Sequence, residues 1–289
     1  MFGVFEKLGE WIQELLISMV ESNLTNMFID VNEQVDMIAK EVGKTPQGWN
    51  ADIFGMIQAL SENVIVPIAG LIITYILCYE LITLILEKNN MQDVDTFMFF
   101  KYFFKMCVAV MLVSHTFDIT IAVFDLAQYV VNQAAGTINS SASIDISAVL
   151  ATMKERMQEM GVGELFGLVF ETLIVSFCMK IMAVIIMVII YGRMIEIYLY
   201  CSVAPIPFAT LSNREWGTIG TNYFKSLFAL GFQGFFIMVC VGIYAILVKA
   251  MTVSDNIHMA IFSIATYTVL LCFTLFKTGS VSKSIFGAH

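Results

Sequence analysis

The sequence predicts an all-α integral membrane protein with an amphipathic N-terminal helix and five transmembrane helices, or six in one alternative. Of the 289 residues, 58% are hydrophobic and only 13% are charged, and the mean hydropathy is +0.81. Soluble domains contain about 45–50% apolar and about 25% charged residues, so this composition indicates a chain that faces lipid. The apolar residues also gather in blocks comparable to the roughly 20 residues that cross a bilayer.

The charge, the cysteines and the missing motifs exclude several classes of function. The formal net charge is −9, whereas nucleic-acid binding depends on clustered Lys and Arg. The six cysteines lie in apolar stretches without a CxxC pair, so we expect small apolar side chains rather than metal ligands. The sequence also lacks HExxH, GxxxxGKS/T, GxSxG and GxGxxG. We expect no catalytic residue, no cofactor and no metal.

Residues 1–63 are predicted to form an amphipathic helix followed by an extramembrane segment. Apolar residues from Val4 to Met19 recur at helical spacing, with acidic and amide side chains between them. Trp11 would suit the headgroup level if this helix lay on the membrane, but the acidic face fits packing on a partner subunit equally well. Residues 28–63 are more polar and contain a turn-forming cluster at 44–49.

A polytopic membrane domain is predicted over residues 64–276, followed by a short cytoplasmic tail, 277–289. Within it, residues 125–163 are expected to be a polar connection, with a loop at 136–143 and a helix at 147–160. The expected apolar spans and blocks are 64–86, 97–123, 165–211, 224–248 and 259–276.

The block 165–211 is too long for one straight crossing. At about 1.5 Å per residue it would measure roughly 70 Å, against a hydrocarbon core of about 30 Å. We expect Gly192 and Arg193 to interrupt it, and Pro205 and Pro207 to break or kink the helix within 193–211. The block is either one span with a broken interfacial or re-entrant segment, or a tight hairpin of two spans.

The distribution of Lys and Arg favours five spans with the N-terminus outside and the C-terminus inside. In that arrangement most basic residues near the spans, including Lys88, Lys105, Arg214 and Lys277, fall on the cytoplasmic side. A sixth span would move Arg214 and Lys277 outside. We therefore prefer the five-span topology.

Ionisable residues inside the apolar spans are the candidate functional residues, because each costs roughly 2.5–3.5 kcal/mol at a helix centre. Glu80 and Lys180 would lie at similar depth, so one hypothesis is an interhelical ion pair. The alternative is that each extends separately to the inner interface. Arg193 and Glu196 are spaced i, i+3 and would neutralise one another locally. The intramembrane candidates are Glu80, Glu171, Lys180, Arg193 and Glu196.

Small residues lie on one side of the span 224–248. Gly231, Gly234 and Gly242 recur at helical spacing there, and small residues let helix backbones approach closely in lipid. This stripe predicts a helix-packing face rather than a ligand site.

A short motif resembles the TrbL-like polytopic channel subunits of type IV secretion and conjugation systems. The motif is YLYCSVAPIPFATL at residues 198–211, followed by Trp216 and the glycine-bearing span that starts at Phe224. In that family a long hydrophobic segment ends in a similar small-residue, proline and Phe stretch, before a polar loop with an aromatic residue and further spans. The order is similar from about residue 64 to 276.

The resemblance implies a structural and conducting part of a DNA-transfer apparatus in the bacterial cytoplasmic membrane. Such a subunit would form homo-oligomers beside the system's ATPases and scaffold proteins, and would contact the DNA–protein substrate only transiently. Pro205 and Pro207 would hold a break facing the cytoplasmic entrance. The alternative is a small-solute or ion transporter, although the sequence has no inverted repeats with matching broken helices. Such a transporter would lose flux when Glu80, Glu171 or Lys180 alone is neutralised.

Overall fold

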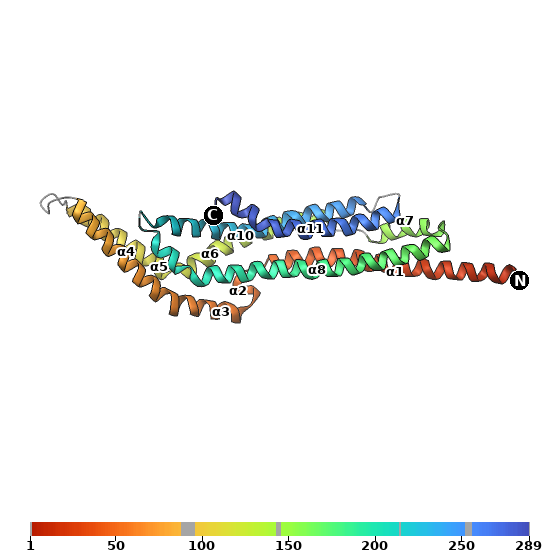
Figure 1. Ribbon diagram of the computed structural model, residues 1–289, viewed down its shortest axis with the longest axis horizontal. Helices are drawn as coiled ribbons and strands as arrows, with labels where there is room; N and C mark the ends of the chain where they lie inside the picture. Colours follow the sequence, from red (N-terminus) through yellow and green to blue (C-terminus); the bar gives the residue numbers. More distant parts are fainter. Residues whose placement is uncertain (1, 88–95, 143–145, 214, 252–255, 289) are drawn as a thin grey trace. The chain divides into compact units, whose positions relative to one another are not determined.

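The computed structural model describes residues 2–87, 96–142, 146–213, 215–251 and 256–288. Within these ranges every regular element is helical (Figure 1), which confirms the predicted all-α class. The helices are α1 (Phe2–Val42), α2 (Pro46–Trp49), α3 (Ala51–Leu60), the π-helical turn η1 (Ser61–Ile65), α4 (Val66–Glu87), α5 (Thr96–Ser114), α6 (Thr116–Ala142), α7 (Ile146–Gln158), α8 (Val162–Val203), α9 (Pro205–Thr210), α10 (Gly217–Met251) and α11 (Ile257–Phe286).

Among the described residues, five helical stretches are long and apolar enough to cross a membrane, as the preferred reading predicted. They are Ala51–Leu86, Phe97–Ser114, Val162–Val203, Gly217–Met251 and Ile257–Phe286. Each overlaps one of the predicted spans. The protein is therefore an all-α multi-pass membrane protein.

The third apolar block, residues 165–211, is one uninterrupted helix as far as Val203. α8 continues through Gly192 and Arg193, so the expected interruption there is wrong, and so is the hairpin of two spans. A single glycine inside a helix costs only about 1 kcal/mol relative to alanine, which a long helix tolerates. The helix ends at Val203 and α9 begins at Pro205, while Pro207 lies inside α9. The 42 residues of α8 correspond to roughly 60 Å.

The first span begins earlier than expected. Helix α3 passes through η1 into α4 without a break. The predicted extramembrane segment is therefore mostly helical, because α1 covers it as far as Val42 and α3 begins at Ala51. Pro67 lies inside this continuous helical run. A proline removes one N–H and crowds the preceding turn, and a π-helical turn absorbs both effects. Here the N–H of Val66 donates to the carbonyl of Ser61, five residues back.

The region between the second and third spans is more helical than predicted. The second span ends at Ser114, and α6 begins at Thr116 after a single residue, His115. The loop expected at 136–143 is wrong up to Ala142, where α6 ends, and its last residue lies outside the described residues. The alanines beside Gly136 are strong helix formers and outweigh the glycine. The helix predicted at 147–160 is present as α7.

The expected cytoplasmic tail, 277–289, is also mostly helical. α11 continues to Phe286, and Gly287 adopts a positive φ of 59°. The N–H of Ala288 donates to the carbonyl of Lys283 at 2.9 Å, and that of Gly287 to Ser284 at 3.3 Å. This is a Schellman cap, in which glycine supplies the left-handed residue that ends a helix.

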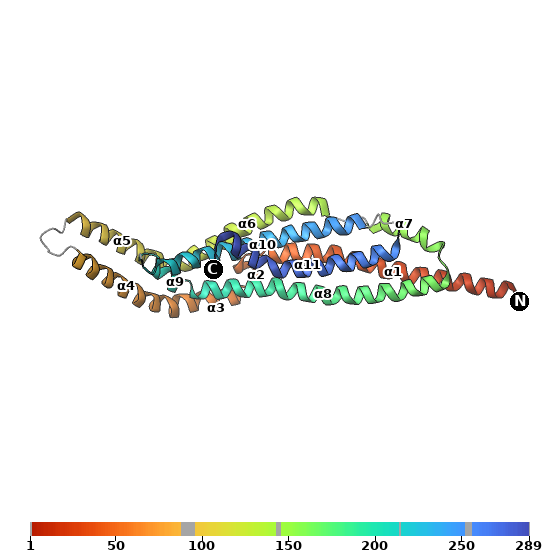
Figure 2. The ribbon, with the colours of Figure 1, turned by 45° about the horizontal axis from the view of Figure 1, so that its top comes forward.

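The described chain divides into two compact units, and the long helices contribute to both. The first unit comprises residues 1–43, 132–190 and 235–278. Within it, α1 runs beside α8 in the same direction (Figures 1 and 2). The amide of Gln13 donates to the carbonyl of Met160 at 3.0 Å, and the amide of Asn23 donates to Thr172 Oγ1 at 3.0 Å. The apolar stripe of α1 is buried in this unit along most of the helix, from Leu16 to Val42.

The second unit comprises residues 44–131, 191–234 and 279–289. One apolar core joins α9 to the α4–α5 hairpin through Ala69, Ile73, Leu77, Ala109, Val113 and Ala209. A second core gathers around Phe124, Met194, Tyr198, Phe208 and Leu227. The Tyr198 hydroxyl donates to the carbonyl of Pro46 at 2.6 Å, which fastens the turn before α3 to α8.

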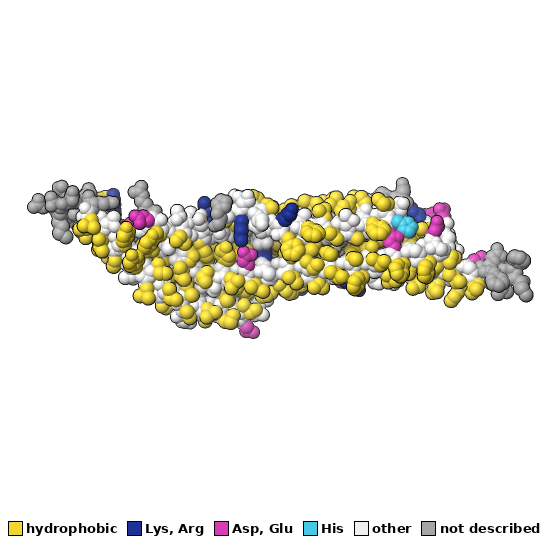
Figure 3. All heavy atoms as spheres, viewed as in Figure 1, with side chains coloured by type: hydrophobic (Ala, Val, Ile, Leu, Met, Phe, Trp, Pro, Cys, Tyr) yellow, Lys and Arg dark blue, Asp and Glu magenta, His cyan; other side chains and the backbone are white. Residues whose placement is uncertain are grey.

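Large apolar side chains are exposed on the membrane-spanning helices. Figure 3 shows hydrophobic side chains over most of the visible surface, with charged side chains only in small groups. On α8 the exposed apolar side chains include Phe166, Phe170, Phe177, Val184 and Val188. Exposed apolar faces of this extent fit contact with lipid.

Candidate functional site

The break after α8 is held by hydrogen bonds. The Thr210 hydroxyl donates to the carbonyl of Pro207 at 2.7 Å and accepts from the N–H of Gly220 at 3.0 Å. A Cβ at Gly220 would lie 2.6 Å from the Pro207 carbonyl, so only glycine fits this approach. The break is therefore a fixed turn between α8 and α10 and not an open hinge.

The polar connection after the break is fastened to α4 by an aromatic stack. The side-chain oxygen of Asn213 accepts from the N–H of Trp216 at 3.0 Å. The Trp216 ring stacks on Tyr75 and on Tyr79, with centroids 5.8 and 6.1 Å away and interplanar angles of 8° and 15°. Stacked aromatic pairs add about 0.5–1.5 kcal/mol beyond the area that they bury. Trp216 therefore anchors the loop, a role that its sequence neighbours do not indicate.

Arg193 is buried at a glycine-lined contact between α8 and α10. Only 5% of the residue is exposed, and its Nη2 donates to the carbonyl of Gly231 at 3.2 Å. A Cβ at Gly234 would lie 2.9 Å from the same Nη2 atom. The missing side chain of Gly234 therefore makes room for the guanidinium beside α10, and Gly231 supplies the carbonyl that it binds.

The glycine stripe of α10 also approaches α6. A Cβ at Gly231 would lie 2.8 Å from the Cβ of Ala127, and one at Gly242 would lie 3.1 Å from Ile138. The structure thus places all three singled-out glycines against side chains of another helix. What the sequence did not indicate is that one of these side chains is the Arg193 guanidinium.

Glu80 pairs with a residue other than the one hypothesised. Its carboxylate on α4 contacts Lys105 on α5, and the two helices form a hairpin in which the Tyr102 hydroxyl donates to the carbonyl of Leu77 at 2.7 Å. Lys105 takes the place proposed for Lys180. Sequence depth alone suggested Lys180, because hydropathy does not reveal which helices pack together.

Two carboxylates of α8 pair with basic residues of α11. Glu171 lies 2.5 Å from His258 Nδ1 in the first unit, and Glu196 lies 3.3 Å from Lys283 Nζ in the second. Each pair is separated by 87 residues in the sequence, and each lies within its own unit. Glu196 also keeps an electrostatic interaction with Arg193, the neighbour that its i, i+3 spacing suggested.

Lys180 lies at the exposed side of α8, beside α1. It lines a cavity of about 250 Å³ together with Asp30, Glu33 and Gln34 of α1. Only 5% of Gln34 is exposed, and its side-chain nitrogen has no hydrogen-bond partner within the described protein. The sequence indicated Lys180 as an isolated charge but gave no sign that polar residues of α1 lie next to it.

The arrangement of these ionisable side chains suits helix–helix association better than catalysis. Within the described ranges, no three His, Cys, Asp or Glu side chains converge to hold a metal ion. The charged side chains instead join neighbouring helices in pairs. In hydrocarbon such pairs satisfy polar groups that would otherwise be costly, and they fix which helices pack together.

Five apolar spans, a proline-broken third span and charge pairs between helices define a polytopic membrane subunit. A family model of the TrbL/VirB6 plasmid conjugal transfer like proteins matches residues 31–205, more than half of the chain. The protein belongs to this family, which places it among the subunits of conjugal transfer systems. The matched region extends from the last third of α1 to Pro205. No curated protein and no solved structure matches the chain significantly.

Replacing Gly234 by alanine should destabilise the protein, because the new methyl group would lie against the buried Arg193 guanidinium. Overpacking of this kind costs about 1–3 kcal/mol. The control is Gly192→Ala on α8, where a Cβ meets nothing within 4 Å and should stabilise the helix by about 0.5–1 kcal/mol. Thermal unfolding in detergent measures both. Equal effects of the two substitutions would contradict the assigned contact.

Reversing the charge of Glu80 or of Lys105 alone should lower the folded yield and the melting temperature, because like charges would then meet in the hairpin. The double variant Glu80→Lys with Lys105→Glu should regain most of the loss. The matched control combines Glu80→Lys with Lys180→Glu, which should not rescue. Rescue by Lys180→Glu instead would show that the carboxylate pairs with α8.

Proposed function

We propose that the protein is a structural and conducting subunit of a conjugative type IV secretion system in the bacterial cytoplasmic membrane. Several copies would associate to help form the path that DNA and protein take. The single observation that carries the proposal is the family match over residues 31–205. The five apolar spans support it, because such a subunit must remain embedded in the membrane.

The internal construction of the chain is consistent with a scaffold role. Its break at Pro205 is held by Thr210 and by the stack of Trp216 on α4. The charged residues of the spans tie helices to one another. A rigid frame of this kind suits a conduit whose driving force comes from separate ATPases. The partners we propose are these ATPases, scaffold proteins and further copies of this chain.

The preferred orientation has the N-terminus outside and the C-terminus inside. It rests on the distribution of Lys and Arg beside the spans. In this orientation the proline break lies near the cytoplasmic side, where a substrate would enter. The DNA–protein substrate would contact the subunit only transiently, since the net charge of −9 offers no phosphate-binding surface.

A small-solute or ion transporter is the second candidate. The observation that favours it is that Glu80 and Glu171 each keep one buried carboxylate oxygen without a hydrogen-bond partner in the described protein. Such oxygens inside spans could accept a cation. In that case neutralising Glu80, Glu171 or Lys180 alone would abolish flux through the purified, reconstituted protein. A scaffold would tolerate these changes wherever the helices still pack.

A clean deletion of the gene in donor cells should abolish conjugal DNA transfer and leave donor growth unchanged. Restoring the intact chain in trans should restore transfer, because the subunit forms part of the conduit. Transfer frequency to a marked recipient is the measurement, and Gly192→Ala supplied in trans is the control for a folded, altered chain. Unchanged transfer after deletion would contradict the proposal.

A further inference from the structure

The exposed apolar stretch of α8 in the first unit can be compared with the thickness of the hydrocarbon layer. Exposed large apolar side chains follow one face of α8 from Phe166 to Val188. At about 1.5 Å per residue this stretch measures roughly 33 Å, close to the hydrocarbon thickness of about 30 Å. This part of α8 therefore has the length and the surface of a membrane crossing.

Helix α1 accompanies α8 through the same depth. Asn23 bonds to Thr172, and eleven residues further along α1, Gln34 lines a cavity with Met179, Lys180 and Ala183. The two helices thus advance together. Because α1 carries many charges, it is not among the five stretches that are apolar enough to count as spans.

The outward face of α1 is polar along this depth. Its exposed positions include Ser18, Ser22, Asn26, Glu33 and Asp36, with Met19 and Ile29 as apolar members. A carboxylate costs roughly 2.5–3.5 kcal/mol at the centre of a bilayer. A face with this composition does not suit lipid, whereas the neighbouring face of α8 does.

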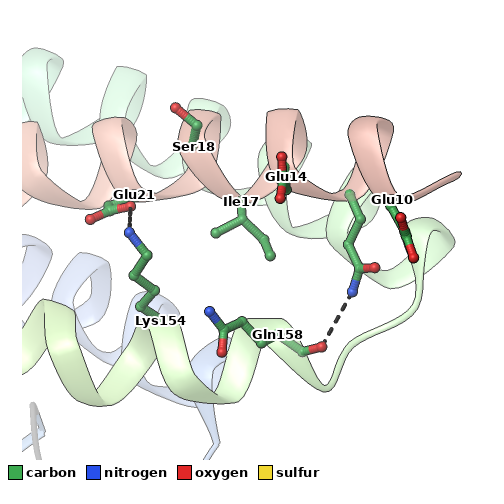
Figure 4. A pocket seen from close by; sticks show the side chains of 8 residues that line it. Glu10, Glu14, Ile17, Ser18, Glu21, Lys154 and Gln158 are labelled. Atoms are coloured by element: carbon green, nitrogen blue, oxygen red, sulfur yellow. Dashed lines mark hydrogen bonds and ion pairs between the residues drawn. The ribbon is translucent and has the colours of Figure 1, made fainter. Parts of the chain in front are cut away.

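Two cavities adjoin this outward face of α1, one on each flank. The first, of about 530 Å³, lies between α1 and α7 and is lined by Glu10, Glu14, Ser18 and Gln158, with Glu21 paired to Lys154 at 2.9 Å (Figure 4). The second is the cavity of about 250 Å³ that holds Asp30, Glu33, Gln34 and Lys180. Together they extend a polar surface along α1.

Gln34 supplies an independent sign that water enters the second cavity. Its side chain is 95% buried and its nitrogen has no partner within the described protein. A buried donor without an acceptor costs about 1–3 kcal/mol, and a water molecule among two carboxylates and an ammonium group removes that cost. The Lys180 ammonium group would also be hydrated in this cavity, whereas in lipid it would not.

We propose that α1 crosses the hydrocarbon layer beside α8, and that its polar face, together with Gln34 and Lys180, borders a water-filled path. This inference rests on the proposed function, for it names the surface of the subunit that would line the conduit. The apolar face of α8 would meet lipid, and the polar face of α1 would meet water at the same depth.

Labelling of single cysteines with a charged, membrane-impermeant maleimide tests this path. In a cysteine-free variant of the full chain in its native membrane, Ser18→Cys, Ser22→Cys and Asn26→Cys report on α1. The matched controls are Phe170→Cys, Phe177→Cys and Val184→Cys, which lie on the exposed face of α8. We expect fast labelling on α1 and essentially none on α8, while serine-to-cysteine changes keep the side-chain size.

Protection of the α1 cysteines to the same extent as the α8 cysteines would overturn the inference, whether lipid or another protein covers them. The labelling result is independent of the transfer assay. Loss of transfer on deletion with protected α1 cysteines would retain the proposed function and reject the path. Labelled α1 cysteines with unchanged transfer would retain the path and reject the proposed function.

Discussion

The need to satisfy charged groups along one long apolar helix organises much of this structure. α8 carries Glu171, Lys180, Arg193 and Glu196 within 42 residues, and lipid solvates none of them. Each therefore meets polar groups from another helix. His258 and Lys283 of α11, the Gly231 carbonyl of α10 and the polar residues of α1 supply them. The neighbours of α8 follow from these requirements.

The glycines of α10 show how this constraint acts on packing. A guanidinium is bulky, and burying it beside a helix needs a neighbour without side chains at the point of contact. Gly231 offers its carbonyl and Gly234 offers the space. Where no charge is involved, as at Gly242 against Ile138, the same small residues simply bring two helices close together.

The end of α8 imposes a second constraint on the structure. Pro205 cannot continue the helix, so the backbone groups freed at the break need other partners. Thr210 bridges Pro207 and Gly220, and Asn213 caps the start of the next turn. Trp216 then lies on Tyr75 and Tyr79 of α4. This part of the chain also carries the family resemblance that the sequence showed.

The number of spans and the proline break could be predicted because hydropathy and backbone chemistry are local properties. The continuity of the helices at Gly136 and Gly192 could not be predicted, because flanking helix formers outweigh the single glycines there. The early start of the first span was missed because a π-helical turn admits Pro67 inside a helix. The partners of Glu80 and Glu171 escaped sequence reasoning, because they depend on which helices pack together and in what register. Both charge pairs are separated by 87 residues in the sequence, but this separation can be linked to pairing only when α8 and α11 are seen to lie side by side.

The register of α11 against α8 is the most direct test of this account. Cysteines introduced in pairs, at Glu171 with His258 and at Glu196 with Lys283, can be treated in native membranes with a short bifunctional methanethiosulfonate. We predict a crosslink within the chain for both pairs, and much less for the mismatched pair of Glu171 with Lys283. Failure of the two matched pairs, or crosslinking of the mismatched one, would contradict the claim that charge pairing on α8 determines how the helices assemble.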